Sequence, residues 1–251
     1  MADLIMALRF FSRLPAGNSP HEAPDLGRIA MALPFAAVIM AIIPCAIILL
    51  GAWAGIPHFF VATLAVASMA IVGGGMMEDS LADSADGLFG GYTRERRLDI
   101  LKDSRHGTYG VSALCLFLVL RITAIGSLIA INPLTAVGVW LAANLIGRSG
   151  GLWVSVALPQ ARDEGASAAA GQLPRSRYLV GLGLATLLLV IIGGLATSLL
   201  GVAAALFAVA LVVVGWTALC KRLVGGQTGD LIGAAAGLGE IAALTALLIF
   251  V

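Results

Sequence analysis

Apolar residues follow one another along this chain in long blocks, and most charged residues lie in the segments between them. No Asp, Glu, Lys or Arg occurs from Ile29 to Met77, and Pro57 and His58 divide this stretch into two runs. Each run is close to the ~20 residues that a helix needs to cross a bilayer. The pattern predicts an all-α, polytopic integral membrane protein with about seven transmembrane helices, within a range of about six to eight. The predicted spans lie near residues 33–54, 59–77, 109–131, 134–157, 178–200, 202–219 and 232–251.

The boundary between the fifth and sixth spans is the least distinct, because only small or apolar residues occur from Ser198 to Val202. Two crossing helices joined by a tight turn would give this pattern. A re-entrant hairpin would give a similar one, so both alternatives stay open here.

The N-terminal segment has a different pattern from the spans. Leu4, Leu8 and Phe11 recur at helical spacing, while Arg9 interrupts the apolar run and Arg13 follows it. These charges are not typical of a signal peptide. The spacing favours an amphipathic helix at the membrane interface over a disordered N-terminus.

The composition agrees with a membrane protein. The chain is 60% hydrophobic and 12% charged, which is too apolar for a soluble domain of 251 residues. Cys45, Cys115 and Cys220 all fall inside predicted spans, so no disulfide framework is expected. No repeat of solenoid period is visible, and we expect one transmembrane domain over residues 1–251.

The positive charges lie on one predicted side of the membrane. With seven spans, the N-terminus and the loops 78–108, 158–177 and 220–231 share a side, and they carry every Lys and Arg except Arg121 and Arg148. The positive-inside rule places this side in the cytoplasm. A channel or transporter should offer polar groups on both faces, whereas this chain has one polar face.

An acidic motif, "EDSLADSADG", occupies residues 78–87. On a helix, Asp79, Asp83 and Asp86 lie within about 60° of one another. Three carboxylates on one stripe repel each other, which favours a divalent cation between them, and oxygen ligands suit Mg²⁺. Glu78 lies about 100° around the helix, so we expect it beside the metal set, near the substrate or solvent. A solvated acidic loop is the alternative interpretation.

Two further loops supply groups for phosphate chemistry. "KDSRHGTYG", residues 102–110, contains Asp103 and Arg105, and "GGQTGD", residues 225–230, has glycines that let backbone amides approach an anion. The second loop is not a P-loop, and alone it is also compatible with a turn in which Asp230 caps the last helix. Together the loops supply carboxylates that could bind a metal, basic side chains that could bind phosphate, and flexible glycine-rich backbone. This combination indicates phosphoryl transfer.

The motifs "EDSLADSADG", "RRLDILKDSRHGTYG" and "KRLVGGQTGDLIGA", in this order, resemble the cobalamin synthase family, also called adenosylcobinamide-GDP ribazoletransferases. "ALRFFSRLP" and "LPQARDEG…AAGQLP" resemble family segments more weakly. The family pattern carries His and Gly where this chain has Met77 and Ser80, so no role is assigned to Met77.

The resemblance implies a transferase of the bacterial or archaeal cytoplasmic membrane, with its active face in the cytoplasm. A hydroxyl of α-ribazole, or of its 5′-phosphate, would attack the cobinamide-proximal phosphoryl of adenosylcobinamide-GDP and release GMP, with Mg²⁺ required. No nucleic-acid partner is expected. A homo-oligomer or an association with other cobalamin-assembly enzymes is left open. The candidate catalytic residues are Asp83, Asp86, Asp103 and Arg105, the metal ligands are Asp79, Asp83 and Asp86, and the substrate-binding residues are Glu78, Lys102, Ser104, Gly107, Thr108, Gly110, Arg148, Gly225, Gly226, Thr228 and Asp230.

Two alternative functions are compatible with parts of the sequence. The acid spacing is similar to that of CDP-alcohol phosphotransferases, but their Ala-Arg pair ahead of "GxxxDxxxD" is absent. A cation-coupled transporter would explain charges at membrane depth, yet the acids gather at one membrane edge and no internal repeat is visible.

Three charged residues lie within predicted spans. Glu240 falls near mid-bilayer, where an ionised carboxylate needs a partner, and we predict an ion pair with Arg121 or Arg148. A polar pocket open to the cytoplasm is the alternative. Arg148 would either reach the interface or meet a substrate phosphate. His106 is expected to be a loop residue rather than a ligand, because no second His or Cys stands near it at zinc spacing.

Overall fold

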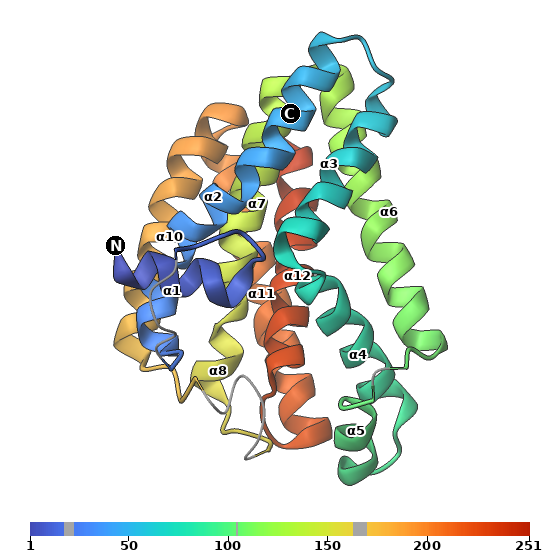
Figure 1. The fold of residues 1–251 in the computed structure, drawn as a ribbon, viewed down its shortest axis with the longest axis vertical. Helices are drawn as coiled ribbons and strands as arrows, with labels where there is room; N and C mark the ends of the chain where they lie inside the picture. The colour runs from blue at the N-terminus through green and yellow to red at the C-terminus, as the bar shows by residue number, and fades with distance from the viewer. Residues whose placement is uncertain (18–22, 104, 163–169) are drawn as a thin grey trace.

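The computed structural model describes residues 1–17, 23–103, 105–162 and 170–251 (Figure 1). All named elements in these parts of the chain are helices, which confirms the all-α class. They are α1 (Ala2–Phe11), α2 (Leu26–Trp53), α3 (His58–Gly73), α4 (Met76–Gly90), α5 (Arg94–Ile100), α6 (Thr108–Ile131), α7 (Pro133–Gly151), α8 (Trp153–Ala157), α10 (Arg175–Ala196), α11 (Leu199–Val224) and α12 (Gly229–Leu248).

The centre of the bundle is the pair α7 and α12. Helix α7 packs against α12, α10 and α2, and α12 also packs against α11 and α4. Trp140 and Ala143 of α7 and Ala243 and Leu247 of α12 are fully buried in the main apolar cluster. Small residues bring membrane helices close together. The outer helices therefore surround a tightly packed central pair.

Five of the described helices are long and apolar enough to cross a membrane, namely α2, α6, α10, α11 and α12. A sixth is reached if the bent pair α3 and α4 is taken as one span. Helix α7 is not among them, because its interior carries Asn144, Arg148 and Ser149. The protein is therefore an all-α polytopic membrane protein, and the count of seven spans stays a prediction.

The second predicted span, 59–77, is broken. Helix α3 ends at Gly73, and Gly74 and Gly75 both take left-handed backbone angles, with φ of +66° and +70°. Glycine adopts this conformation without the steric cost that other residues meet. Helix α4 then starts at Met76, bent by 86° from α3. The acidic motif thus lies on a helix of its own.

The boundary at Ser198 is resolved as a turn between two long helices. Helix α10 ends at Ala196 and α11 starts at Leu199. The Ser198 side chain accepts a hydrogen bond from the backbone N–H of Gly201 at 3.1 Å, which caps α11. Each of the two helices is by itself long enough to cross a membrane.

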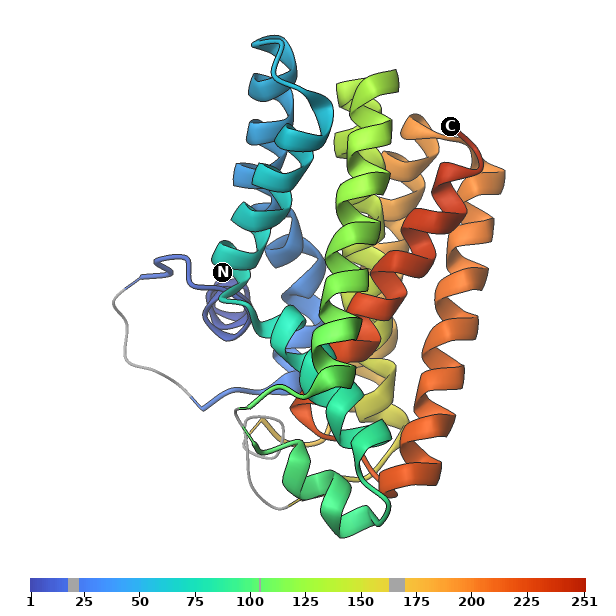
Figure 2. The ribbon, with the colours of Figure 1, turned by 90° about the vertical axis from the view of Figure 1, so that its right-hand side faces the viewer.

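The N-terminal segment forms the predicted helix, α1, which lies across the bundle axis (Figures 1 and 2). Met6 and Ala7 are buried against Ile29 and other apolar residues of α2. Arg28 of α2 donates to Asp3 at 2.6 Å. The helix is therefore anchored on α2, and its place at a membrane interface stays a prediction.

The polar loops meet at one end of the bundle, where α4 ends, α5 lies and α11 turns into α12 (Figure 2). Arg94 of α5 donates to the carbonyl of Val224 at 2.8 Å. The backbone N–H of Ala161 donates to the carbonyl of Gln227 at 2.9 Å. Segments from the predicted loops 78–108, 158–177 and 220–231 are thus joined by hydrogen bonds, and the cytoplasmic orientation of this end stays a prediction.

Candidate active site

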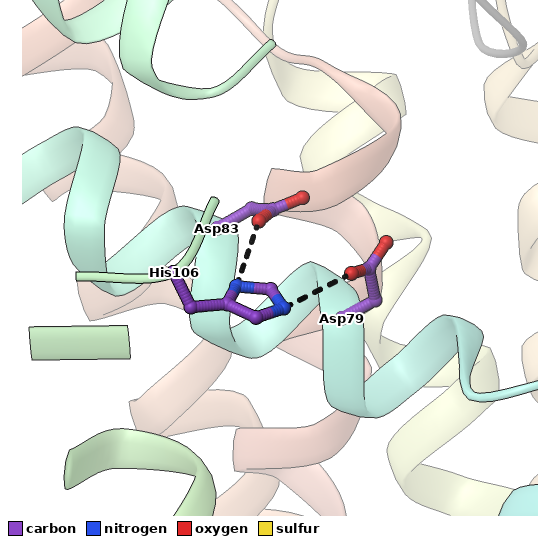
Figure 3. A group of neighbouring side chains, drawn as sticks. All are labelled: Asp79, Asp83 and His106. Carbon is purple, nitrogen blue, oxygen red and sulfur yellow. Dashed lines mark ion pairs between the residues drawn. The ribbon is translucent and has the colours of Figure 1, made fainter. Parts of the chain in front are cut away.

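Two acids of α4 and one histidine form a compact group at the polar end (Figure 3). His106 Nδ1 lies 3.5 Å from Asp83 Oδ1, and His106 Nε2 lies 3.8 Å from Asp79 Oδ1. One ligand-capable atom from each residue lies within 4.8 Å of those of the other two. Asp79 and Asp83 are four residues apart, so one helical turn places both on the same face. The geometry suits a divalent cation.

Asp86 holds the neighbouring loop in place. Its carboxylate accepts hydrogen bonds from the backbone N–H of Gly107 at 2.6 Å and of Gly110 at 2.9 Å. These are amides at the start of α6, which have no partner within the helix. A Cβ on Gly110 would meet the Asp86 carboxylate and lie 2.8 Å from the carbonyl oxygen of Ala82. The close approach of α4 and α6 therefore needs glycine there.

The set brought together differs from the predicted metal set in one member. Asp79 and Asp83 are included, but Asp86 is 93% buried and turned toward α6, and His106 takes the third place. The physical reason is that the Asp86 oxygens serve the N-terminal amides of α6. His106 lies in a loop as expected, but that loop is tied to Asp86 through Gly107, which carries the imidazole to the acids.

Asp83 is the electrostatically unusual member of the group, and it lies between the predicted spans 59–77 and 109–131. Burial and the nearby charge of Asp79 raise the pKa of Asp83 to about 7. Asp230 and Asp86 act in the same direction, and His106 opposes them. A bound cation would favour the charged form of Asp83 and remove this penalty.

A cavity of about 360 Å³ adjoins the acidic group. It lies between α1, α2, α3, α4, α7 and α12, and Asp79 lines it. The predicted substrate-binding residues Glu78, Arg148 and Asp230 also line it. The structure therefore brings three of these residues to one cavity, beside a candidate metal ligand.

A buried polar network runs from this cavity into the bundle. Arg121, which is fully buried, donates to Glu240 at 3.0 Å and to Glu78 at 3.0 Å. The prediction that Glu240 pairs with Arg121 or Arg148 is confirmed, and the partner is Arg121. Trp140 donates from its indole nitrogen to Glu240 at 2.9 Å. A polar pocket is the alternative to this ion pair that the sequence leaves open. Glu78 and Arg148 line the cavity, so part of the network also lies in a pocket.

The "GGQTGD" loop is built around the start of α12. The Thr228 side chain accepts from the backbone N–H of Leu231 at 3.4 Å, so Thr228 caps the helix rather than Asp230. Asp230 instead accepts from Arg162 at 3.1 Å. Gly225 ends α11, and a Cβ on Gly226 would lie 2.8 Å from the carbonyl oxygen of Pro159. These contacts shape the loop, and a role of these residues in substrate binding stays a prediction.

The predicted catalytic residues Asp103 and Arg105 bind each other. Arg105 donates to the two Asp103 oxygens at 3.0 and 2.7 Å. This pairing lowers the pKa of Asp103 to about 2. Lys102 precedes the pair, Thr108 begins α6, and Ser104 lies outside the described residues.

Comparison with known proteins decides the family. The family model described as cobalamin-5-phosphate synthase matches residues 3–248. The chain belongs to the cobalamin-5-phosphate synthase family. The resemblance carried by the three motifs is therefore confirmed. Membership of this family is favoured over the two alternatives, a CDP-alcohol phosphotransferase and a cation-coupled transporter.

Three relatives in the cobalamin-5-phosphate synthase family cover between 80% and 100% of the chain. A protein of Azorhizobium caulinodans is 43% identical over 100% of this chain and 96% of its own length. One of Sinorhizobium medicae is 38% identical over 98% of this chain and 95% of its own length, and one of Bradyrhizobium diazoefficiens is 37% identical over 80% and 77%. All three are named adenosylcobinamide-GDP ribazoletransferase. No solved structure matches the chain.

Met77 and Ser80 of α4, in this member of the cobalamin-5-phosphate synthase family, face α12. Met77 is buried with Phe117 and Ala234, and it lines the cavity. Ser80 is buried against Gly233, where a Cβ would meet the Ser80 hydroxyl. Both side chains therefore shape the cavity wall next to Asp79.

Proposed function

We propose that this protein is the membrane transferase that joins adenosylcobinamide-GDP to α-ribazole or its 5′-phosphate, with release of GMP. The observation that carries the proposal is the acidic group Asp79, Asp83 and His106 beside a cavity, in a chain of the cobalamin-5-phosphate synthase family. The three relatives described above are named for this transfer.

The donor set fits a divalent cation. Mg²⁺ is commonly held by one or two carboxylates and completes its shell with substrate phosphates and water. Asp79 and Asp83 supply the carboxylates, and Asp79 faces the cavity, where a pyrophosphate would be reached. We therefore assign Mg²⁺ to these two acids, and the His106 imidazole lies beside them. When bound, the cation would polarise the pyrophosphate and stabilise the departing GMP.

The chain's own residues would orient the two substrates. Arg162 and Asp230 pair at the cavity edge, and Arg148 lies inside the cavity. Asp86 holds His106 toward the acids by way of Gly107.

The active end is assigned to the cytoplasm, and the membrane to the cytoplasmic membrane. The N-terminus and the three polar loops carry every Lys and Arg outside the helices of Arg121 and Arg148. Such charges stay on the cytoplasmic side of membrane proteins. Both substrates would therefore reach the site from the cytoplasm.

Release of GMP from adenosylcobinamide-GDP tests the function. The full chain is purified into lipid nanodiscs and supplied with the donor and α-ribazole 5′-phosphate, with and without Mg²⁺. GMP and a joined corrinoid product should form together only when both substrates and Mg²⁺ are present. A protein that binds both substrates and forms no joined product under these conditions is not this transferase.

A further inference from the structure

The cavity beside Asp79 has the size and lining of a site for a small aromatic nucleotide. Its volume of about 360 Å³ is near the lower end of ligand pockets, which span roughly 300–1,000 Å³. A corrinoid that carries GDP is several times larger than a ribazole nucleotide, so only the smaller substrate fits inside. The apolar lining comes from α1, α2, α3, α4 and α12 and from Leu152, and it includes Phe10, Phe11, Leu33, Met69 and Met77.

One buried cation lines this cavity without a carboxylate partner among the described residues. Arg148 is only 8% exposed, and its Nε donates to the Asn144 side chain at 3.1 Å. Within the described parts of the chain, its two terminal nitrogens form no hydrogen bond. Arg121 differs, since it pairs directly with Glu78 and Glu240. A buried guanidinium with free N–H groups is suited to bind a phosphate through two parallel hydrogen bonds.

The network behind Arg148 fixes its orientation. Asn144 donates from its amide nitrogen to Glu240 at 3.0 Å, so its amide oxygen is left to accept from Arg148. Glu240 in turn is held by Arg121 and Trp140. Asn144 is therefore a positioning residue, and Glu240 sets which way its amide points.

We propose that this cavity binds the acceptor in its phosphorylated form, with the flat apolar base among the methionine and phenylalanine side chains and the 5′-phosphate on Arg148. This rests on the proposed function and adds to it the site and the residue that reads the phosphate. Asp79 lines the same cavity, so an acceptor anchored at Arg148 presents its ribose toward the acidic group. The phosphate monoester of phosphatidic acid, a membrane lipid, has the same chemistry as the 5′-phosphate, and the test separates these two sources.

Acceptor binding without the corrinoid donor tests the proposal. The affinities of α-ribazole and α-ribazole 5′-phosphate are measured by equilibrium dialysis with the full chain in phosphatidylcholine nanodiscs. The parent should bind the phosphate at least about tenfold more tightly, a gain typical of charge-assisted hydrogen bonds. Arg148→Met should reduce this preference to about twofold or less while affinity for α-ribazole stays nearly unchanged.

Three other variants make the test specific. Asn144→Ala keeps the charge of Arg148 but frees its guanidinium, and most of the preference should be lost. Met76→Trp narrows the cavity from a partly exposed position and should weaken both ligands alike. Arg222→Met removes an exposed arginine at the same end of the bundle and should change neither affinity. If Arg148→Met does not fold, the Asn144 and Met76 variants still test whether the acceptor binds in this cavity with its phosphate on Arg148.

Two results overturn the proposal. One is a preference for the phosphate that survives in both the Arg148 and the Asn144 variants. The other is competition by phosphatidic acid for this site in a parent that does not distinguish the two ribazoles, which would assign the cavity to lipid. GMP release is measured on the same preparations. A parent that forms joined product but shows no phosphate preference overturns this inference alone, and the proposed function stands.

Discussion

The carboxylate of Asp86 accepts a hydrogen bond from the backbone N–H of Gly107 at 2.6 Å, and the next residue toward the N-terminus is His106. This contact joins α4 to the loop ahead of α6, which brings the imidazole to Asp79 and Asp83. The position of His106 beside Asp79 and Asp83 therefore depends on Asp86, whose own carboxylate is directed toward α6.

Asp86→Ala should cost about 1–3 kcal/mol of stability, because the buried backbone amide of Gly110 and the partly buried amide of Gly107 lose their acceptor. It should also lower the affinity for a divalent cation, since His106 is no longer held. Thermal unfolding in detergent and a Mn²⁺ titration followed by electron paramagnetic resonance measure the two effects. Unchanged Mn²⁺ affinity in a destabilised variant would show that Asp86 does not position His106.

Gly110→Ala should destabilise the same junction, because the added methyl meets the Asp86 carboxylate and the carbonyl oxygen of Ala82. Gly183→Ala in α10 is the matched control, since nothing lies within 4 Å of a Cβ there. Replacing a helical glycine by alanine at an open site is neutral or stabilises by up to ~1 kcal/mol. Equal melting temperatures for the two variants would contradict the close packing of α4 on α6.

Asp83 should make stability depend on pH when no metal is bound. Folding raises the pKa of Asp83 from its ordinary value of 3.8 to about 7. The contribution of this group to the free energy of unfolding is therefore fully present below pH 3.8 and is lost as the pH rises through about 7. Without Mg²⁺, Asp83→Asn should therefore melt at a higher temperature than the parent at pH 8, with little difference at pH 4. Glu95→Gln, at an exposed position on α5, is the control. Parallel pH profiles for the parent and Asp83→Asn would mean that burial does not penalise this carboxylate.

Glu240→Gln should lower thermal stability, because it leaves the buried Arg121 with Glu78 as its remaining carboxylate partner among the described residues. Breaking a buried pair from one side costs about 3–5 kcal/mol. Adding Arg121→Met should restore part of the loss, and the recovery is incomplete because Glu78 then loses its partner. Thermal unfolding of the two single variants and the double variant measures the coupling. Strictly additive losses would show that the pair contributes nothing.

Much of the fold could be predicted from the sequence, because long apolar blocks bounded by charges allow few alternatives in a bilayer. The helix at Ala2–Phe11 follows from short-range spacing, whereas the sequence left a turn and a re-entrant hairpin both open at Ser198. The break at Gly74 and Gly75 could not be predicted, because glycine pairs also occur inside continuous membrane helices. Whether such a pair bends depends on what packs against it.

The site was less predictable than the fold. Helical spacing places Asp79 and Asp83 together, and the position of Glu240 near mid-bilayer predicts an ion pair with Arg121 or Arg148, of which the structure shows Arg121. Spacing also places Asp86 with them, but amides from a segment more than twenty residues away attract its carboxylate. No local pattern indicates His106, since its approach depends on that same long-range contact.

Mg²⁺-dependent formation of GMP and joined product by the purified chain is the measurement that tests the proposed transfer most directly. The parent, Asp83→Asn and Glu95→Gln are compared in nanodiscs with adenosylcobinamide-GDP and α-ribazole 5′-phosphate. Product should form in the parent and in Glu95→Gln with Mg²⁺ and stop when the ion is chelated. Asp83→Asn should fold, remain in the membrane and lose at least about 100-fold in rate, because the amide lacks the charge that holds the cation. Turnover near the parent's rate in Asp83→Asn at saturating Mg²⁺ would contradict the assignment of this acidic group as the catalytic metal site.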